Sequence, residues 1–465
     1  MYRIIAGLVV AVAVVQGAHA QTLQDVLARA YRSNPTLLGE QANQKAVTEN
    51  SVQARSGWRP TVSINMDANY QQGPYTNAFA LGSYTSNYAE GYVAAKQTLY
   101  SFGHTANQVR AADARSHAER HALRLTEAQV FTSVITAYMN VLRDRAVQDI
   151  RKADLDMLER QVRLTTSRYT LGGAPTEQVT RTDVEQAETR RRSAEVALAQ
   201  ARATRAASEA QFQAVTGVEP KTLTMPAALP GLPSSLDQAM KAALAANPQL
   251  AQMRETKSAT QADVDTARSQ WGPQIQVQGT FGTIGPASPF REREYAQQVT
   301  GTVSLVQPLY NGGLYNSQIR QARDKDEQAR QNVEFARRAA LQNVVTNWRA
   351  VENGLEAIKA GLAEVHSGEM TLKGYQLEYG YGLRSTTDVL YADQNLRSAQ
   401  VDLASSQHDT IVAEAQLLAA IGQLQAGTLL PDTRPYDADA PLRHARTRDW
   451  EPLQAPLAAI DRAGW

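Results

Sequence analysis

The stretch Ala54-Arg55-Ser56-Gly57-Trp58-Arg59-Pro60 occurs twice in this chain, the second time as Ala267-Arg268-Ser269-Gln270-Trp271-Gly272-Pro273. Each copy ends a helical pattern, because proline removes a backbone donor and restricts the residue before it. Directly after each copy the apolar residues change to strict alternation, which is typical of a strand. The two copies lie 213 residues apart (54 to 267), which indicates an internal duplication and not a short solenoid repeat.

Further matches at similar offsets extend the duplication over most of the chain. Asn34-Pro35 matches Asn247-Pro248 at the same offset, and both pairs should interrupt a helix. Later matches lie 210 residues apart: Gln97 to Tyr100 with Gln307 to Tyr310, and Tyr169, Gly172, Thr176 and Val179 with Tyr379, Gly382, Thr386 and Val389. We therefore expect a first repeat at 21–217, a linker at 218–234 and a second repeat at 235–422.

Each repeat is predicted to contain one β-hairpin, at 61–100 and at 274–310. In the first, Val62, Ile64 and Met66 alternate with polar residues over about the length that crosses an outer membrane as a tilted strand. Polar stretches at 71–87 and 282–294 are predicted to be loops that face outside. Four strands are too few to close a membrane barrel, so several protomers would have to contribute.

Very long helices are predicted at 105–168 and 315–378, because these stretches contain scarcely a glycine or proline. At ~1.5 Å per residue, 64 helical residues reach roughly 96 Å. A turn should follow each, and shorter helices should return over about 176–216 and 386–421. By contrast, five prolines among scattered charges predict an irregular tail at 423–465.

The N-terminal 20 residues have the pattern of a secretory signal peptide. A 12-residue apolar run follows Arg3, and Ala18-His19-Ala20 is a small-x-small cleavage site. Without cysteine, the chain can be neither disulfide-bonded nor lipidated on cysteine. Balanced charge (47 Lys and Arg against 46 Asp and Glu) argues against a nucleic-acid partner, and no later segment is apolar enough for a transmembrane helix.

The order of these elements resembles that of the TolC-type outer-membrane channel family over about residues 21–422. The resemblance is carried by the two Asn-Pro pairs, the two strand exits 97–103 and 307–313, and the stretch from Tyr379 to Leu390. It implies an α+β membrane protein that forms a homotrimer. Its 12-stranded β-barrel in the outer membrane would be continued by a long α-helical barrel of coiled-coil hairpins in the periplasm.

The resemblance also implies a periplasmic gate. Tyr379, Arg384 and Asp388 correspond to gate residues of the second helical hairpin, and Glu177 and Gln178 occupy the place of their partners in the first. Tyr391 stands where the best-known members have a second acidic ring. The turns at Gly172, Gly173, Gly382 and Leu383 would dock a periplasmic adaptor protein.

The implied function is a passive exit duct, in the outer membrane, of a tripartite efflux pump or type I secretion system. Its partners would be that adaptor, an inner-membrane pump or ABC transporter, and outer-membrane lipid. No nucleophile–base pair or phosphate loop is present, so we expect no enzyme and no cofactor. The alternative is a periplasmic coiled-coil adaptor or scaffold, which would not need alternating strands in both halves.

Three groups of residues have ordinary as well as functional interpretations. His117 and His121 have a spacing that can hold a metal, but a solvated helix face explains them better, and we expect no metal site. Arg190-Arg191-Arg192 is typical of a solvated face, although a lumen or adaptor contact remains open. Tyrosines in the first hairpin fit either a membrane-interface belt or strand propensity: Tyr70, Tyr75, Tyr84, Tyr88, Tyr92 and Tyr100.

Overall fold

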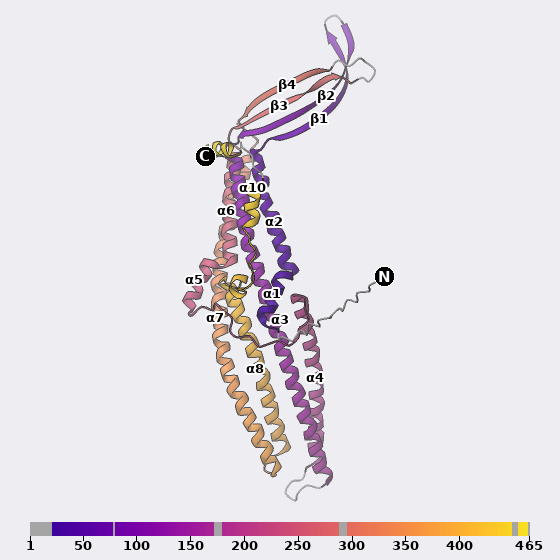
Figure 1. The fold of residues 1–465 in the computed structure, drawn as a ribbon, viewed down its shortest axis with the longest axis vertical. Coiled ribbons are helices and arrows are strands. Elements are labelled where there is room, and N and C mark those ends of the chain that lie inside the picture. The colour runs from indigo at the N-terminus through magenta and orange to yellow at the C-terminus, as the bar shows by residue number, and fades with distance from the viewer. Residues whose placement is uncertain (1–20, 78–79, 172–178, 288–294, 449–453, 464–465) are drawn as a thin grey trace, which may run out of the picture. The chain divides into compact units, whose positions relative to one another are not determined.

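The computed structural model of the chain describes residues 21–77, 80–171, 179–287, 295–448 and 454–463. The expected signal peptide at 1–20 lies outside them. Helices and strands alternate along the described residues in an order that occurs twice (Figure 1). Before the tail they are α1 (Leu23–Ser33), α2 (Pro35–Arg55), η1 (Ser56–Trp58), β1 (Thr61–Asn77), β2 (Ala80–Tyr100), α3 (His104–Leu171), α4 (Arg181–Thr216), α5 (Leu236–Ala246), α6 (Pro248–Ser269), β3 (Gln274–Pro286), β4 (Ala296–Val306), α7 (Leu314–Gly380) and α8 (Thr386–Ala420).

The Asn-Pro pairs interrupt the opening helices as the sequence predicts. Asn34 ends α1, and its side-chain oxygen accepts hydrogen bonds from the backbone of Thr36 and Leu37 at 3.0 and 3.4 Å, which caps α2. Asn247 caps α6 in the same way, accepting from Leu250 N at 2.9 Å, and Pro248 takes the first helical position. Asparagine satisfies exposed backbone donors there, and proline has none to lose.

The four strands form one antiparallel sheet in the order β1-β2-β3-β4. The strands are longer than expected, because β1 continues to Asn77 and β2 begins at Ala80. The predicted loop at 71–87 is therefore wrong, because apart from the two residues between Asn77 and Ala80 this stretch belongs to β1 and β2. The predicted loop at 282–294 is wrong for its first five residues, which belong to β3. Pairing between backbones does not depend on apolar side chains, so polar residues continue the ladder.

The long helices are somewhat longer than predicted, 68 residues for α3 and 67 for α7. Helices α4 and α8 follow them as the return arms of two helical hairpins. No helix in the described ranges is both long and apolar enough to cross a membrane.

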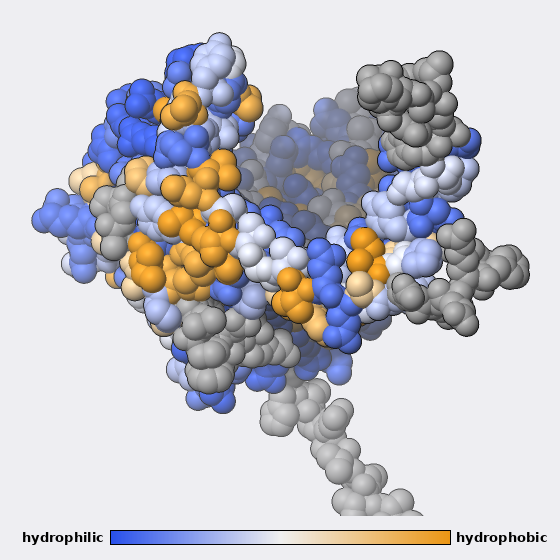
Figure 2. All heavy atoms as spheres, turned by 90° about the horizontal axis from the view of Figure 1, so that it is seen from above, coloured by the Kyte–Doolittle hydropathy of each residue, from blue (hydrophilic) through white to orange (hydrophobic). Residues whose placement is uncertain are grey.

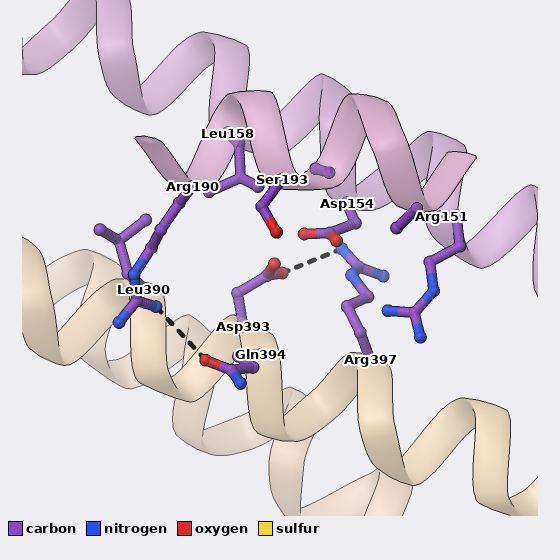
Figure 3. A pocket seen from close by; sticks show the side chains of 11 residues that line it. Arg151, Asp154, Leu158, Arg190, Ser193, Leu390, Asp393, Gln394 and Arg397 are labelled. Atoms are coloured by element: carbon purple, nitrogen blue, oxygen red, sulfur yellow. Dashed lines mark hydrogen bonds and ion pairs between the residues drawn. The ribbon is translucent and has the colours of Figure 1, made fainter. Parts of the chain in front are cut away.

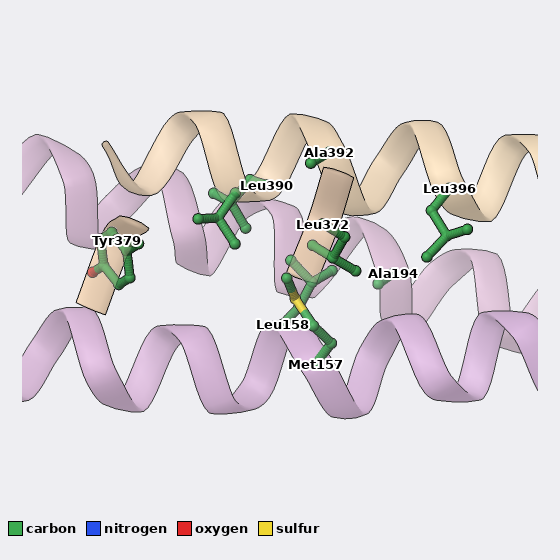
Figure 4. Close-up of a cluster of buried hydrophobic side chains, with 9 residues drawn as sticks. Met157, Leu158, Ala194, Leu372, Tyr379, Leu390, Ala392 and Leu396 are labelled. Atoms are coloured by element: carbon green, nitrogen blue, oxygen red, sulfur yellow. The ribbon is translucent and has the colours of Figure 1, made fainter. Parts of the chain in front are cut away.

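Two compact units can be recognised, and each draws on both repeats. One unit comprises Met1–Leu38, Thr126–Ala245 and Leu341–Pro435; the other comprises Gly39–Leu125, Ala246–Ala340 and Tyr436–Trp465. All four long hairpin helices contribute to a core of the first unit (Figure 4). That core contains Met157, Leu158, Ala194, Leu372, Tyr379, Val389, Leu390, Ala392 and Leu396. The first and second hairpins of one chain therefore pack directly against each other.

The prediction of an irregular tail is wrong, because the tail forms α9 (Ala426–Leu429), α10 (Ala440–Arg448) and α11 (Gln454–Ala463). Leu457 and Ala458 of α11 pack with Trp58, Ala106 and Val109 in a core of the second unit. Its prolines lie mostly between or at the starts of these short helices, where a missing donor costs little. The tail is therefore held by buried contacts that its composition did not reveal.

Candidate functional site

The sheet has one apolar and one polar face, and the strand register keeps them continuous across all four strands. Ile64 pairs with Val93, Val93 with Phe281, and Phe281 with Val299, so that both repeats contribute to one apolar row. Flanking rows contain Val62, Met66, Val277, Val303 and Leu305. Most of these large apolar side chains are strongly exposed in a single chain, from 40% for Val93 to 82% for Met66, whereas Val277 is half-buried.

The opposite face is polar. Ser63 aligns with Ala94, Thr280 and Thr300, and neighbouring rows carry Asp67 beside Glu90 and Lys96 beside Thr61. Figure 2 shows hydrophobic (orange) residues gathered in several patches, with hydrophilic (blue) residues beside and between them. A sheet with charged groups on one face and exposed aliphatic groups on the other suits a boundary between water and hydrocarbon. Strands β1 and β4 leave two open edges.

A tight turn joins α7 to α8 at the end of the second helical hairpin. Gly382 has φ +78°, a left-handed conformation that a side chain would strain, and its N–H donates to Tyr379 O at 3.1 Å. Leu383 N donates to Glu378 O at 2.9 Å. Tyr381 and Leu383 are exposed at the tip. The corresponding expected turn residues Gly172 and Gly173 lie outside the described residues.

Tyr379 is buried at the point where the two hairpins meet (Figure 4). Its hydroxyl accepts a hydrogen bond from Thr386 Oγ1 at 3.2 Å, which ties α7 to α8. The guanidinium of Arg168 from α3 lies 4.2 Å from the ring centroid, a cation–π contact with the first hairpin. The partners expected from the sequence, Glu177 and Gln178, lie outside the described residues.

Arg384 is bound within its own hairpin in this single chain. Its Nε donates to Glu378 Oε2 at 2.7 Å, and its guanidinium lies 4.3 Å from the Tyr375 ring centroid. The hydrogen bond from Arg384 to Glu378 raises the pKa of Arg384. Sequence reasoning missed Glu378, which directly precedes Tyr379 and lies six residues before Arg384, across the turn.

Asp388 caps the start of α8. Its Oδ2 accepts from Ser385 N at 3.1 Å and Ser385 Oγ at 2.9 Å, while Asp388 N donates to Ser385 Oγ at 3.2 Å. Hydrogen bonding from the backbone N–H of Ser385 lowers the pKa of Asp388, so the carboxylate stays charged. Asp388 thus completes a capping box whose N-cap residue is Ser385.

Helix α4 starts with the same capping box, formed by Thr180 and Asp183. The two boxes are 205 residues apart (180 to 385), whereas the sequence alignment used an offset of 210 at this place. Judged by helix starts, Asp183 is the structural counterpart of Asp388, and Gln178 precedes the helix. The first connection (172–180) is four residues longer than the second (381–385), so a constant offset could not show this correspondence.

A buried charge cluster between the two hairpins was also missed (Figure 3). Asp393 of α8 is 1% exposed and forms an ion pair with Arg397 Nη2 at 3.1 Å. The pKa of Asp393 is raised to about 6, chiefly by burial; Arg397 opposes the rise and the adjacent carboxyl of Asp154 on α3 adds to it. The spacing of Asp393 and Arg397, four residues apart on an otherwise apolar face, was the available signal.

The run Arg190-Arg191-Arg192 divides into two roles. Arg191 donates to Glu188 and Glu195 of its own helix, each at 2.5 Å, and Arg192 reaches the same two residues. The hydrogen bond from Arg191 lowers the pKa of Glu188. Arg190 instead faces α8, with its guanidinium 4.8 Å from the Tyr391 ring centroid. Tyr391 stands where the best-known family members have an acidic residue, and here it makes a contact between the two hairpins.

Comparison with known proteins supplies the context for these features. Residues 26–218 and 239–423 match the family described as "Outer membrane efflux protein". The chain is 28% identical to outer membrane efflux protein BepC of Brucella suis biovar 1 (strain 1330), over 95% of this chain and 94% of that protein. It is 25% identical to outer membrane protein TolC of Escherichia coli (strain K12), over 88% of this chain and 84% of TolC.

A more distant relative is alkaline protease secretion protein AprF of Pseudomonas aeruginosa, 24% identical over 65% of this chain and 63% of that protein. Among solved structures, the outer membrane protein VceC of Vibrio cholerae superimposes with a TM-score of 0.73 at 19% identity, covering 86% of this chain and 96% of VceC. At that identity the superposition speaks for the fold alone.

Proposed function

This chain belongs to the outer membrane efflux protein family, and on that basis we propose that three copies of it close one channel through the outer membrane. The function of the chain is that of an outer-membrane exit duct in efflux or type I secretion, as in the relatives it matches. A periplasmic adaptor or scaffold is not favoured, because it would have no use for the exposed apolar face of the sheet.

The observation that carries the trimer is the open, two-faced sheet. Strands β1 and β4 present unpaired edges, and backbone groups in hydrocarbon must be paired. Joining the β4 edge of one copy to the β1 edge of the next pairs every edge once the ring closes. Three copies supply 12 strands, an even number in the range of outer-membrane barrels. The polar face, with Asp67, Glu90 and Lys96, then lines the lumen.

Helix α7 carries a second surface for a neighbouring copy. Leu355, Leu362, Met370 and Leu377 follow one another at spacings of seven or eight residues and are each more than half exposed. Such spacing places them on one stripe of a helix, the pattern of a coiled-coil seam. An adjacent copy would cover this stripe and continue the barrel as helices in the periplasm.

The turn at Gly382 and Leu383 is the proposed docking point for a periplasmic adaptor, with the turn at Gly172 and Gly173 as its counterpart. Exposed Tyr381 and Leu383 give it an apolar tip of the kind that protein partners cover. Energy would come from an inner-membrane pump or ABC transporter, because a passive duct supplies none.

We place the gate at the hairpin ends, around Tyr379, Arg384 and Asp388. In one chain Arg384 is paired with Glu378. If the gate closes through contacts with a neighbouring copy, Arg384 would have to exchange Glu378 for a partner in that copy. Glu177 and Gln178 stay candidates for that partner, and the capping box adds Asp183 as a third. Planar-bilayer conductance of Tyr379→Phe with Arg384→Ser should rise above wild type, and an unchanged conductance would place the closing bonds elsewhere.

Native mass measurement of the detergent-purified protein tests the duct most directly. A trimer is expected, and a stable monomer would overturn the proposed barrel.

An epitope tag inserted after Asn77, at the end of β1, should be reached by antibody on intact cells. Reaction only after the outer membrane is broken would reverse the topology. Deleting the gene and measuring both drug sensitivity and secreted protein then identifies the system it serves.

A further inference from the structure

Two carboxyl groups from different hairpins face each other in the buried cluster of Figure 3. Asp154 projects from α3 and Asp393 from α8, and their carboxyl oxygens lie on either side of the gap between the helices. Arg397 reaches up beside them from α8 and forms the ion pair with Asp393. Leu158 and Leu390 are the large apolar residues in the lining of the cavity around these groups. The acids therefore meet across the interface between the first and second hairpins.

The cavity around this pair is lined by two acids and three arginines, and the arginines differ in what they contact. Arg397 is the one cation in ion-pair contact with Asp393. Arg151 of α3 and Arg190 of α4 line the same cavity, but Arg190 is directed to Gln394 at 3.5 Å and to Tyr391. Helix α7 contributes no residue to the lining. Arg397 is therefore the cation paired with Asp393, and ionising Asp154 as well would set a second negative charge directly against the buried carboxylate of Asp393.

We propose that Asp154 and Asp393 form a proton-operated clasp that holds the two helical hairpins of one protomer together. With one proton between them, the protonated carboxyl donates to the other carboxylate and joins α3 to α8. When that proton leaves to solvent, both groups are negative, the hydrogen bond is lost, and the hairpins repel each other at this point. The consequence for transport rests on the proposed duct and its gate; the clasp itself is a property of a single protomer.

The direction of the pH dependence follows from the pKa of Asp393. Burial raises it from 3.8 to about 6, so the packed hairpins hold a proton more tightly than separated ones. The clasp is therefore fully formed in acid and is lost as the pH rises through about 6.

The absence of native cysteine allows the clasp to be measured by spin labels on introduced cysteines. Lys152→Cys on α3 and Asn395→Cys on α8 are exposed positions next to the clasp. Labelled protein is diluted into trimers with unlabelled protein, and the distance distribution is recorded by pulsed dipolar spectroscopy at pH 5 and pH 7.5. A narrow distribution at pH 5 that becomes longer or broader at pH 7.5, with a midpoint near 6, is expected.

Two substitutions and a control decide the assignment. Asp393→Asn and Asp154→Asn should each give the narrow distribution at both pH values, because neither pair can become doubly charged. Asp402→Asn, an exposed acid on the same helix, should keep the wild-type pH dependence. Identical wild-type distributions at both pH values, or pH dependence that survives in both variants, would overturn the clasp. Bilayer conductance tests the duct separately: absent conductance with pH-dependent distances would reject the duct and retain the clasp.

Discussion

Two aspartates of this chain are equally buried and have opposite surroundings. Asp461 of α11 and Asp393 of α8 are each 1% exposed. Asp461 accepts hydrogen bonds from Ser101 N and Oγ at 2.9 Å, Gly103 N at 3.0 Å and Ala106 N at 3.3 Å, all at the start of α3. Asp393 has one arginine and a second acid.

The difference shows that burial alone does not determine what a carboxylate does in this fold. The start of a helix exposes unpaired N–H groups and a partial positive charge, so a carboxylate placed there is stabilised as an anion. Asp461 thereby fastens the C-terminal helix to the junction between β2 and α3. A carboxylate whose neighbour is another acid gains instead by binding a proton. The first arrangement is a fixed joint, and the second responds to pH.

Asp461→Ala should have the largest effect. It removes the acceptor of four hydrogen bonds and leaves buried donors unpaired, at ~1 kcal/mol or more for each, or about 4 kcal/mol together. The variant should release α11, lower the thermal unfolding midpoint and open the β2–α3 junction to limited proteolysis. Asp432→Ala, an exposed acid of the same tail, is the control and should behave as wild type. Equal protease resistance of both variants would show that α11 is held by its apolar contacts alone.

Ile64→Lys extends the comparison to a charge that would have no partner at all. On the apolar face this lysine would lie in hydrocarbon if the barrel forms, at a cost of about 2–4 kcal/mol near the middle of the bilayer. Asn65→Lys, the next residue, places the same charge on the polar face and is the matched control. Heat resistance of the trimer on gels should fall for Ile64→Lys and not for Asn65→Lys. The reverse result would exchange the two faces.

Asp393→Asn should have a smaller effect of the opposite sign to Asp461→Ala. Because burial raises the pKa of Asp393 to about 6, the wild-type fold pays for ionising it at pH 7.5. At ~1.4 kcal/mol per pKa unit, the rise of this pKa from 3.8 to about 6 costs about 3 kcal/mol, which the neutral amide avoids. The amide also loses part of the charged contact with Arg397, at about 1–2 kcal/mol, so the variant should be more stable by about 1–2 kcal/mol at pH 7.5. At pH 5 the gain should shrink, since the wild-type acid is then largely protonated. A gain that is the same at both pH values would remove the link to ionisation.

Sequence patterns predicted the elements whose signals are local or periodic. The Asn-Pro pairs, the alternation after Trp58 and the scarcity of helix breakers in α3 and α7 all correspond to observed elements. The tail failed because α11 is held by partners 360 residues away, Asp461 with Ser101 among them, and no local pattern encodes such a contact. The resemblance to the family identified Arg384 and Asp388. Which residues of the first hairpin correspond to them depends on where the helices start, and a constant offset does not give that.

The smallest expected effect concerns Asp388, a half-buried acid whose charge and capping role can be separated. Asp388→Asn removes the charge but keeps a side-chain oxygen for Ser385, whereas Asp388→Ala removes both. If the carboxylates of three copies attract cations at the proposed periplasmic entrance, both variants should reduce block by multivalent cations equally in planar bilayers. If the residue acts only as a cap, neither should change the block, and only Asp388→Ala should loosen the first turn of α8, measured as faster amide hydrogen exchange. Asp183→Asn and Asp183→Ala repeat the measurement on α4, where the same box stands in the first hairpin. Equal effects at both helix starts would make Asp183 the structural and functional counterpart of Asp388, and an effect at Asp388 alone would confine the gate to the second hairpin.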